Sequence, residues 1–136
     1  MTESKNIVEN TSKDQFDEAL KSEKSKIMAE SKNIIEITSK DQFNEALKSE
    51  KLTIVDFWAE WCGPCRVLKP LLHKIAGEHP EIQLLTVDVD QNQELAAQYD
   101  INSIPAVFFF KIGEIVDSFV GVMPENEILE KIEANK

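Results

Sequence analysis

The chain has 136 residues, 42% of them hydrophobic, which is enough apolar material for one domain with a single core. Its formal net charge of -10 and pI near 4.7 argue against nucleic acid or an anionic membrane as the main partner. No apolar run approaches the roughly 18 residues needed to span a bilayer, and the polar start of the chain does not resemble a secretory signal.

The front of the chain contains a near-duplication. Residues 1–24 recur as residues 28–51, and only four of the 24 pairs differ. Two such units are too few for a solenoid, which needs about three or more repeats to stack. We therefore interpret residues 1–27 as a duplicated β-α segment and residues 28–136 as a complete domain.

The two copies differ at one position that matters for burial. The second copy has Ile37 where the first has Asn10, and burying that Asn without partners would cost about 1–3 kcal/mol. We therefore expect the second copy, at residues 31–51, to take the native place in the fold. Three arrangements are open to the first copy: a mobile extension, pairing at a sheet edge or swapping into a neighbouring molecule as a domain-swapped dimer, or displacement of the second copy.

From residue 33 onward, hydrophobic periodicity predicts five strands and four helices. In chain order they are a strand at 33–37, a helix at 41–47 capped by Ser39, a strand at 52–58, a helix at 63–78 with a kink at Pro70, a strand at 83–89, a helix at 92–99, a strand at 106–110, a turn at 111–114, a strand at 115–120 and a helix at 125–133. This order predicts an α/β fold: a central mixed sheet, with three parallel strands plus an antiparallel hairpin, flanked by helices.

The two cysteines of the chain, Cys62 and Cys65, enclose Gly63-Pro64 between a predicted strand and the start of a predicted helix. In a first helical turn the i and i+3 side chains lie close, so the two sulfurs can form a disulfide. The helix N-terminus stabilises a thiolate at Cys62, the nucleophile for disulfide exchange, and Pro64 suits the first turn. Cys65, further into the helix, would resolve the mixed disulfide. A single cysteine pair does not fit a secreted disulfide scaffold, so a cytoplasmic location is expected.

A structural metal half-site is the alternative interpretation of the cysteine pair. A tetrahedral site needs two more ligands, and the only histidines, His73 and His79, do not stand at zinc-finger spacing. We therefore predict no metal, and we expect both histidines to lie on a solvated helix surface without a catalytic role.

Two further residues stand out near the cysteines. Asp56 interrupts an apolar strand, where burial should raise the pKa of its carboxyl. It is interpreted as a proton acceptor and donor for Cys65, the alternative being a carboxylate satisfied at a strand edge. Pro105 precedes the strand at 106–110, either as an ordinary strand starter, which the residues by themselves favour, or as a cis-proline.

Several motifs, in order and at the spacing of the family, closely resemble the thioredoxin family. They are Val55–Arg66, Val87–Asp90, Ser103–Ala106, Phe110–Glu114 and Val120–Gly121. The match covers about residues 31–136. A Cys-x-x-Cys pair alone would be a weak signal, but this ordered set is specific.

The resemblance implies roles for individual residues. Cys62 would attack, Cys65 would resolve and Asp56 would be the buried acid–base residue. Pro105 would be cis and pack against the disulfide, while the Ile104 backbone would pair with an extended substrate segment. The remaining contact surface would be formed by Trp61, Gly63, Pro64 and Gly121.

The resemblance also implies the redox partners. No cofactor would be bound, because the redox group is the Cys62–Cys65 disulfide itself. Electrons would come from NADPH through a flavin-containing thioredoxin reductase, and disulfide-containing proteins would be the substrates. The Gly-Pro pair is similar to that of the reducing members, which implies the thioredoxin reduction potential of about -270 mV.

The chain departs from the family in two places. Bacterial members often carry a lysine close to the buried acid, at the position of Thr86, so the proton affinity of Asp56 cannot be transferred from the family. The duplicated front end is also foreign to it.

We therefore predict a protein thiol–disulfide oxidoreductase, that is, a protein-disulfide reductase. One alternative is a binding module of the same fold, which would use the surface around Trp61, Ile104 and Gly121 and would not need the thiols. The other is a duplication engineered for folding or strand-swapping studies.

Overall fold

The apolar run Leu52–Trp58 forms strand β2, the centre of a five-stranded sheet. In the computed structural model, which describes residues 32–136, the strand order is β1-β3-β2-β4-β5. The other strands are β1 (Ile34–Glu36), β3 (Ile82–Asp88), β4 (Ala106–Lys111) and β5 (Glu114–Val120). Strands β1, β3 and β2 are parallel, while β4 and β5 form an antiparallel hairpin. The predicted mixed sheet is confirmed.

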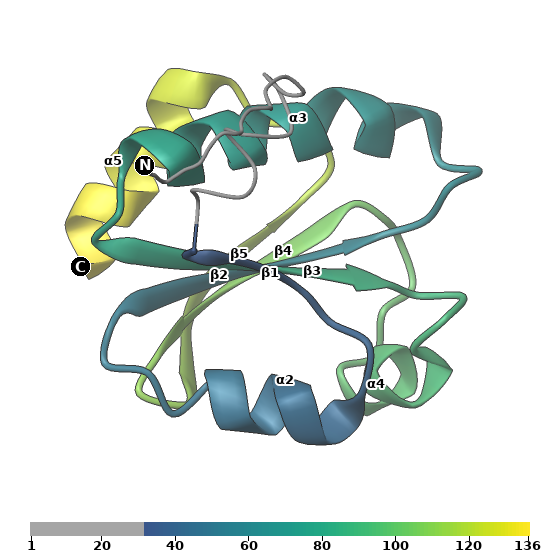
Figure 1. The fold of residues 1–136 in the computed structure, drawn as a ribbon. Helices are drawn as coiled ribbons and strands as arrows, with labels where there is room; N and C mark the ends of the chain where they lie inside the picture. Colours follow the sequence, from purple (N-terminus) through teal and green to yellow (C-terminus); the bar gives the residue numbers. More distant parts are fainter. Residues whose placement is uncertain (1–31) are drawn as a thin grey trace, which may run out of the picture. The chain divides into compact units, whose positions relative to one another are not determined.

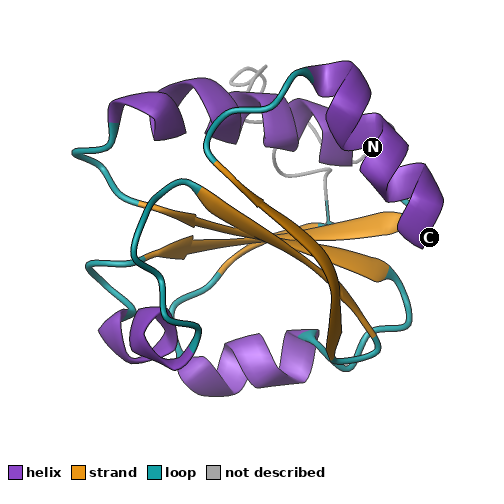
Figure 2. Ribbon diagram, turned by 180° about the vertical axis from the view of Figure 1, so that it is seen from behind, coloured by secondary structure: helices purple, strands orange, loops and turns teal. Residues whose placement is uncertain are grey.

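Helices cover both faces of this sheet. Figure 1 shows α3 (Gly63–Glu78) and α5 (Glu125–Asn135) on one side, and α2 (Lys40–Ala46) and α4 (Gln93–Gln98) on the other. The same three layers are visible from behind in Figure 2. Within residues 32–136, no helix has the length and apolar character needed to cross a membrane.

The sheet separates the core into two halves, and the side chains of β2 contribute alternately to each half. Leu52 and Ile54 pack with α3 and α5, whereas Val55 and Phe57 pack with α2 and α4. Side chains of a strand alternate between faces, so both faces of β2 are buried, as the apolar run predicts. Asp56 consequently points to the α3 side.

The second copy of the repeat occupies the position beside β3. Ile34 and Ile35 pair with Leu84 and Leu85 in parallel register, and Ile37 is only 2% exposed. The structure thus confirms the expected place of this copy over residues 32–51. The predicted segment 1–27 lies outside the described residues.

Element ends differ slightly from the predicted ones. Strands β1 and β3 and helices α2 and α4 begin or end one residue or so away from the expected limits, which is the usual uncertainty at element termini. Helix α3 runs from 63 to 78 as predicted and continues through Pro70. The hairpin turn is shorter than predicted, because only Ile112 and Gly113 separate the strands, both at positive φ (49° and 80°).

Candidate active site

The two cysteines lie where β2 leads into α3. They are joined by a disulfide, with 5.3 Å between their Cα atoms. Cys62 is the N-cap of α3, and its Sγ accepts a hydrogen bond from the backbone N–H of Cys65 at 3.2 Å. Unpaired N–H groups and the helix dipole therefore act on the Cys62 sulfur, as the sequence predicts.

Burial hardly distinguishes the two sulfur-bearing residues. Cys62 is 4% exposed and Cys65 is 2% exposed. Both form a small cluster with Ala59, against which Trp58 and Ile104 pack. Exposure therefore does not distinguish the two cysteines, whereas position does, because Cys62 is the N-cap of α3 and Cys65 lies within the helix.

An exposed rim surrounds the cysteines. Trp61 is 68% exposed, and its Nε1 donates a hydrogen bond to Asp90 Oδ2 at 2.9 Å. Gly63 and Pro64 are exposed at the start of α3. The sequence analysis assigned no role to Asp90, although this residue belongs to one of the thioredoxin-like motifs. Its hydrogen bond to Trp61 could not be predicted, because the two residues lie 29 positions apart in the sequence.

The Ile104–Pro105 peptide bond is cis. This confirms the geometry implied by the resemblance, and the interpretation of Pro105 as an ordinary strand starter is wrong. The carbonyl oxygen of Pro105 accepts a hydrogen bond from the Gly121 N–H at 2.8 Å. Gly121 has φ of 90°, a conformation that residues with a Cβ rarely adopt. The structure thus brings Ile104 to the cysteines and ties Gly121 to the adjoining Pro105.

Asp56 is buried in the central strand, 1% exposed, and neither carboxyl oxygen has a hydrogen-bond partner among the described residues. The alternative of a carboxylate satisfied at a strand edge is therefore wrong. Burial raises the pKa of Asp56 to about 7, with the positive charge of Lys69 acting in the opposite direction. A group with such a pKa can both accept and donate a proton near neutral pH.

Lys69 is a residue that sequence reasoning missed. Its Nζ lies 3.5 Å from the centroid of the Trp58 ring, a cation–π contact. Lys69 follows Cys65 by four residues in α3, so the helical spacing could have pointed to it. The aromatic ring that Lys69 contacts belongs to Trp58 of β2, so helical spacing alone does not predict this contact.

His73 does not lie on a solvated surface as predicted. It is half-buried, and its Nε2 is buried without a hydrogen-bond partner among the described residues. Burial lowers the pKa of His73, as does Lys69, while Glu36 acts to raise it. His79 follows α3 and places Nδ1 3.1 Å from Glu81 Oε2. Within residues 32–136, no cluster of three or more His, Cys, Asp or Glu side chains could hold a metal ion.

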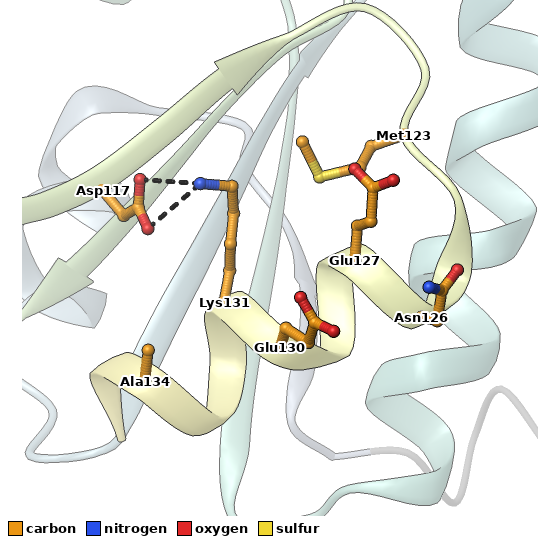
Figure 3. Close-up of a pocket in the computed structure, with 7 residues that line it drawn as sticks. All are labelled: Asp117, Met123, Asn126, Glu127, Glu130, Lys131 and Ala134. Atoms are coloured by element: carbon orange, nitrogen blue, oxygen red, sulfur yellow. Dashed lines mark hydrogen bonds and ion pairs between the residues drawn. The ribbon is translucent and has the colours of Figure 1, made fainter.

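A surface depression of about 690 Å³ lies elsewhere, between α5 and β5 (Figure 3). The Asp117–Lys131 ion pair, at 3.1 Å, forms part of its lining. None of the predicted site residues lines it. The chemistry of the chain therefore centres on the cysteines rather than on this depression.

Known proteins match most of the described chain. The sequence pattern of the family described as Thioredoxin matches residues 34–134. A thioredoxin of Mycoplasmoides gallisepticum is 43% identical over 77 residues, covering 57% of this chain and 77% of that protein. A thioredoxin of Staphylococcus saprophyticus is 43% identical over 83 residues, covering 60% and 80%. The structure of Fasciola hepatica thioredoxin has a TM-score of 0.70 at 37% identity, covering 74% of this chain and 98% of that chain.

Sequence, sheet topology and redox centre agree with these relatives. The mixed five-stranded sheet flanked by helices is the thioredoxin fold. The two bonded cysteines stand at the start of α3, where dithiol chemistry requires them. The chain belongs to the thioredoxin family, and its Cys62–Cys65 pair makes it a dithiol–disulfide oxidoreductase of the protein-disulfide reductase type.

Proposed function

We propose that Cys62 is the attacking and Cys65 the resolving cysteine in the reduction of disulfides of other proteins. The observation that carries this assignment is the place of Cys62 at the N-cap of α3, where its sulfur accepts the Cys65 N–H. A thiolate is stabilised by such a donor and by the helix dipole. Cys65 lies one turn inside the helix and 5.3 Å away between Cα atoms.

The reaction transfers two electrons in two exchanges. The Cys62 thiolate attacks one substrate sulfur, a Cys62–substrate bond forms, and the substrate disulfide breaks as its other sulfur leaves as a thiolate. Cys65 then loses its proton and attacks the Cys62 sulfur. The Cys62–Cys65 bond forms, the second substrate thiolate leaves, and both substrate thiolates take up protons.

In this proposal Asp56 accepts the Cys65 proton in the second exchange and returns it when the protein is reduced again. The pKa of Asp56, raised by burial to about 7, supports the role, because both protonation states are populated near neutral pH. The absence of a hydrogen-bond partner for its oxygens within residues 32–136 also supports it, since no ion pair holds the carboxylate in one state.

The substrate surface would surround Cys62. Trp61, Gly63 and Pro64 are exposed beside it, and Ile104 packs against the cysteine cluster. The backbone of Ile104 would pair with an extended substrate segment, while Pro105 and Gly121 would shape the adjoining edge. The hydrogen bond between the Pro105 carbonyl and Gly121 supports a fixed geometry there.

The oxidised pair needs a reductant to start another cycle. As in other members of the family, NADPH would supply electrons through a thioredoxin reductase. We place this cycle in a reducing cytoplasm, which is supported by the presence of only one cysteine pair.

Residues 1–27 would be an appendage to a thioredoxin domain at 28–136. The pairing of β1, which belongs to the second copy, with β3 supports this arrangement. The alternative is exchange of the copies between molecules in a domain-swapped dimer. Sizing chromatography distinguishes the two, because the appendage predicts a single monomeric peak.

A matched pair of cysteine variants tests the assignment of roles. Cys65→Ser should accumulate a covalent complex with a disulfide substrate such as insulin, because the mixed disulfide is no longer resolved. Cys62→Ser should form no such complex and should lose insulin reduction. Non-reducing electrophoresis and mass spectrometry measure both outcomes.

The opposite pattern, with trapping in Cys62→Ser only, would exchange the two roles. Full biological activity of the Cys62→Ser/Cys65→Ser double variant would instead favour the binding-module alternative. The reduction potential is an independent check, because a value near -120 mV, that of a strong oxidant, would contradict a reductase.

A further inference from the structure

One row of the sheet beneath α3 carries polar side chains on three neighbouring strands. Glu36 of β1 pairs with Thr86 of β3, and Thr86 pairs with Asp56 of β2. Their strand neighbours Ile34, Leu84 and Ile54 all belong to the core half under α3 and α5. Because side chains two apart in a strand share a face, the polar row faces α3 as well.

Helix α3 adds polar groups to the same layer. Cys65, Lys69 and His73 follow one another at intervals of four residues, so they lie along one side of the helix on successive turns. Within residues 32–136, the buried side-chain polar atoms without a hydrogen-bond partner are Asp56 Oδ1 and Oδ2, Trp58 Nε1 and His73 Nε2. All of them belong to this face of the sheet or to α3.

Lys69 is the cation of this layer. It is half-buried, and its ammonium is held 3.5 Å from the Trp58 ring centroid. Trp58 follows Asp56 by two residues in β2, so the ring and the carboxyl point to the same side. The cation–π contact thus fixes the ammonium on the side of the sheet that carries Asp56.

The other groups that face this layer do not replace that charge. Glu36 of β1 and Asp88 of β3 carry negative charges, and β4 places Val107 opposite Asp56. Burial and the charge of Lys69 lower the pKa of His73, which favours its neutral form near pH 7. Thr86, which pairs with Asp56, has no charge.

We propose that Lys69 is a positioning residue that acts on the reaction through Asp56. Its ammonium is held from α3 against the Trp58 ring, and its positive charge limits the proton affinity of the buried Asp56 carboxyl. The inference rests on the proposed role of Asp56 in exchanging a proton with Cys65.

The consequence for the reaction follows from the sign of the interaction. Burial raises the pKa of Asp56 and Lys69 lowers it, so loss of the lysine charge leaves the carboxyl protonated up to higher pH. A protonated carboxyl cannot accept the proton of Cys65. The second exchange should therefore slow at pH 7 and recover at higher pH.

The test compares Lys69→Met, Lys69→Gln and Lys69→Arg with the wild-type full chain. Lys74→Met is the matched control, because Lys74 lies on the same helix but pairs with Glu125 at the surface. NMR titration of the oxidised proteins follows the Asp56 carboxyl carbon and the His73 ring. In the Met and Gln variants the Asp56 midpoint should rise by about one pH unit, and the His73 midpoint should rise too. Lys69→Arg and Lys74→Met should match the wild type.

Stopped-flow measurement of mixed-disulfide resolution provides the kinetic readout. Lys69→Met should be several-fold slower than wild type at pH 7, with its pH profile displaced to higher pH, and Lys69→Arg should restore the rate. Unchanged Asp56 midpoints in both neutral variants would overturn the proposal. If the wild type itself failed to reduce disulfides, the proposed function would fall, while the titration would still report on Lys69.

Discussion

Asp56 is a buried carboxyl that lowers the stability of the fold and has a proposed role in the reaction. It stands in the middle of β2, with 1% exposure and no hydrogen-bond partner among the described residues. Burying such a group is unfavourable, most of all when it is ionised. In the function proposed above, the raised pKa that burial produces is what allows Asp56 to exchange a proton with Cys65.

The raised pKa of Asp56 predicts that the free energy of unfolding falls as pH rises. The Asp56→Asn variant should lack this pH dependence. The pKa of Asp56 is raised by burial from 3.8 to about 7 on folding. Its contribution to stability is therefore fully present below pH 3.8 and is lost as pH rises through 7. Relative to Asp56→Asn, the wild type should lose on the order of 4 kcal/mol between pH 4 and pH 8.

Urea unfolding at the two pH values measures this difference. Asp100→Asn is a suitable control, because Asp100 is exposed and its φ of 52° is tolerated by Asn. Its effect should be the same at pH 4 and pH 8. An equal effect of Asp56→Asn at both pH values would contradict the raised pKa.

At the scale of single residues, local signals located the chemistry but not its supporting contacts. The spacing of the cysteines and the lone carboxylate in an apolar strand identified Cys62, Cys65 and Asp56. The partners Asp90 and Lys69 were missed, because each contacts a tryptophan on another element. Such contacts depend on how elements pack, which no local pattern encodes.

Among the elements, α2 shows how a short helix is defined at its start. The Ser39 Oγ accepts a hydrogen bond from the Gln42 N–H at 3.1 Å, and Gln42 Oε1 accepts one from the Thr38 N–H at 2.6 Å. The first bond satisfies one of the N–H groups that a helix N-terminus leaves unpaired, and the second ties the residue before the cap to the first turn. The predicted N-cap is confirmed.

Removal of this cap should destabilise the protein without affecting the redox centre. Ser39→Ala should lower the free energy of unfolding by about 1 kcal/mol, whereas Ser39→Asn should retain most of it, because Asn caps as well as Ser does. Urea unfolding measures both variants. A loss as large in Ser39→Asn as in Ser39→Ala would mean that the side chain acts otherwise than as a cap.

At the scale of elements the predictions were close, since periodicity and capping are properties of short segments. The strand ends and the turn at Ile112-Gly113 differed by a residue or so. His73 was placed wrongly, because the packing of α3 on the sheet covers one side of the histidine that the sequence alone left open.

For the whole molecule, the duplicated front end raises the question of which copy belongs to the sheet. Residues 32–136 contain a complete five-stranded sheet with helices on both faces, and β1 in it comes from the second copy. The position beside β3 is thus filled by the second copy.

A chain lacking residues 1–27 should accordingly keep its unfolding free energy and its rate of insulin reduction. Guanidine unfolding and turbidity assays of the full and shortened chains provide the comparison. A marked loss of stability or activity in the shortened chain would show that the first copy contributes to the domain, as in an exchanged or swapped arrangement.

The sequence by itself determined the redox pair, the buried acid and the mixed α/β architecture. These depend on the Cys62–Cys65 spacing at a strand–helix junction and on periodicities within single elements. Only the tertiary structure decided the strand order, the contact of Ile104 with the cysteines and the contact of Lys69 with the Trp58 ring. The physical reason is that these features depend on the register of distant strands and on the way α3 packs across them.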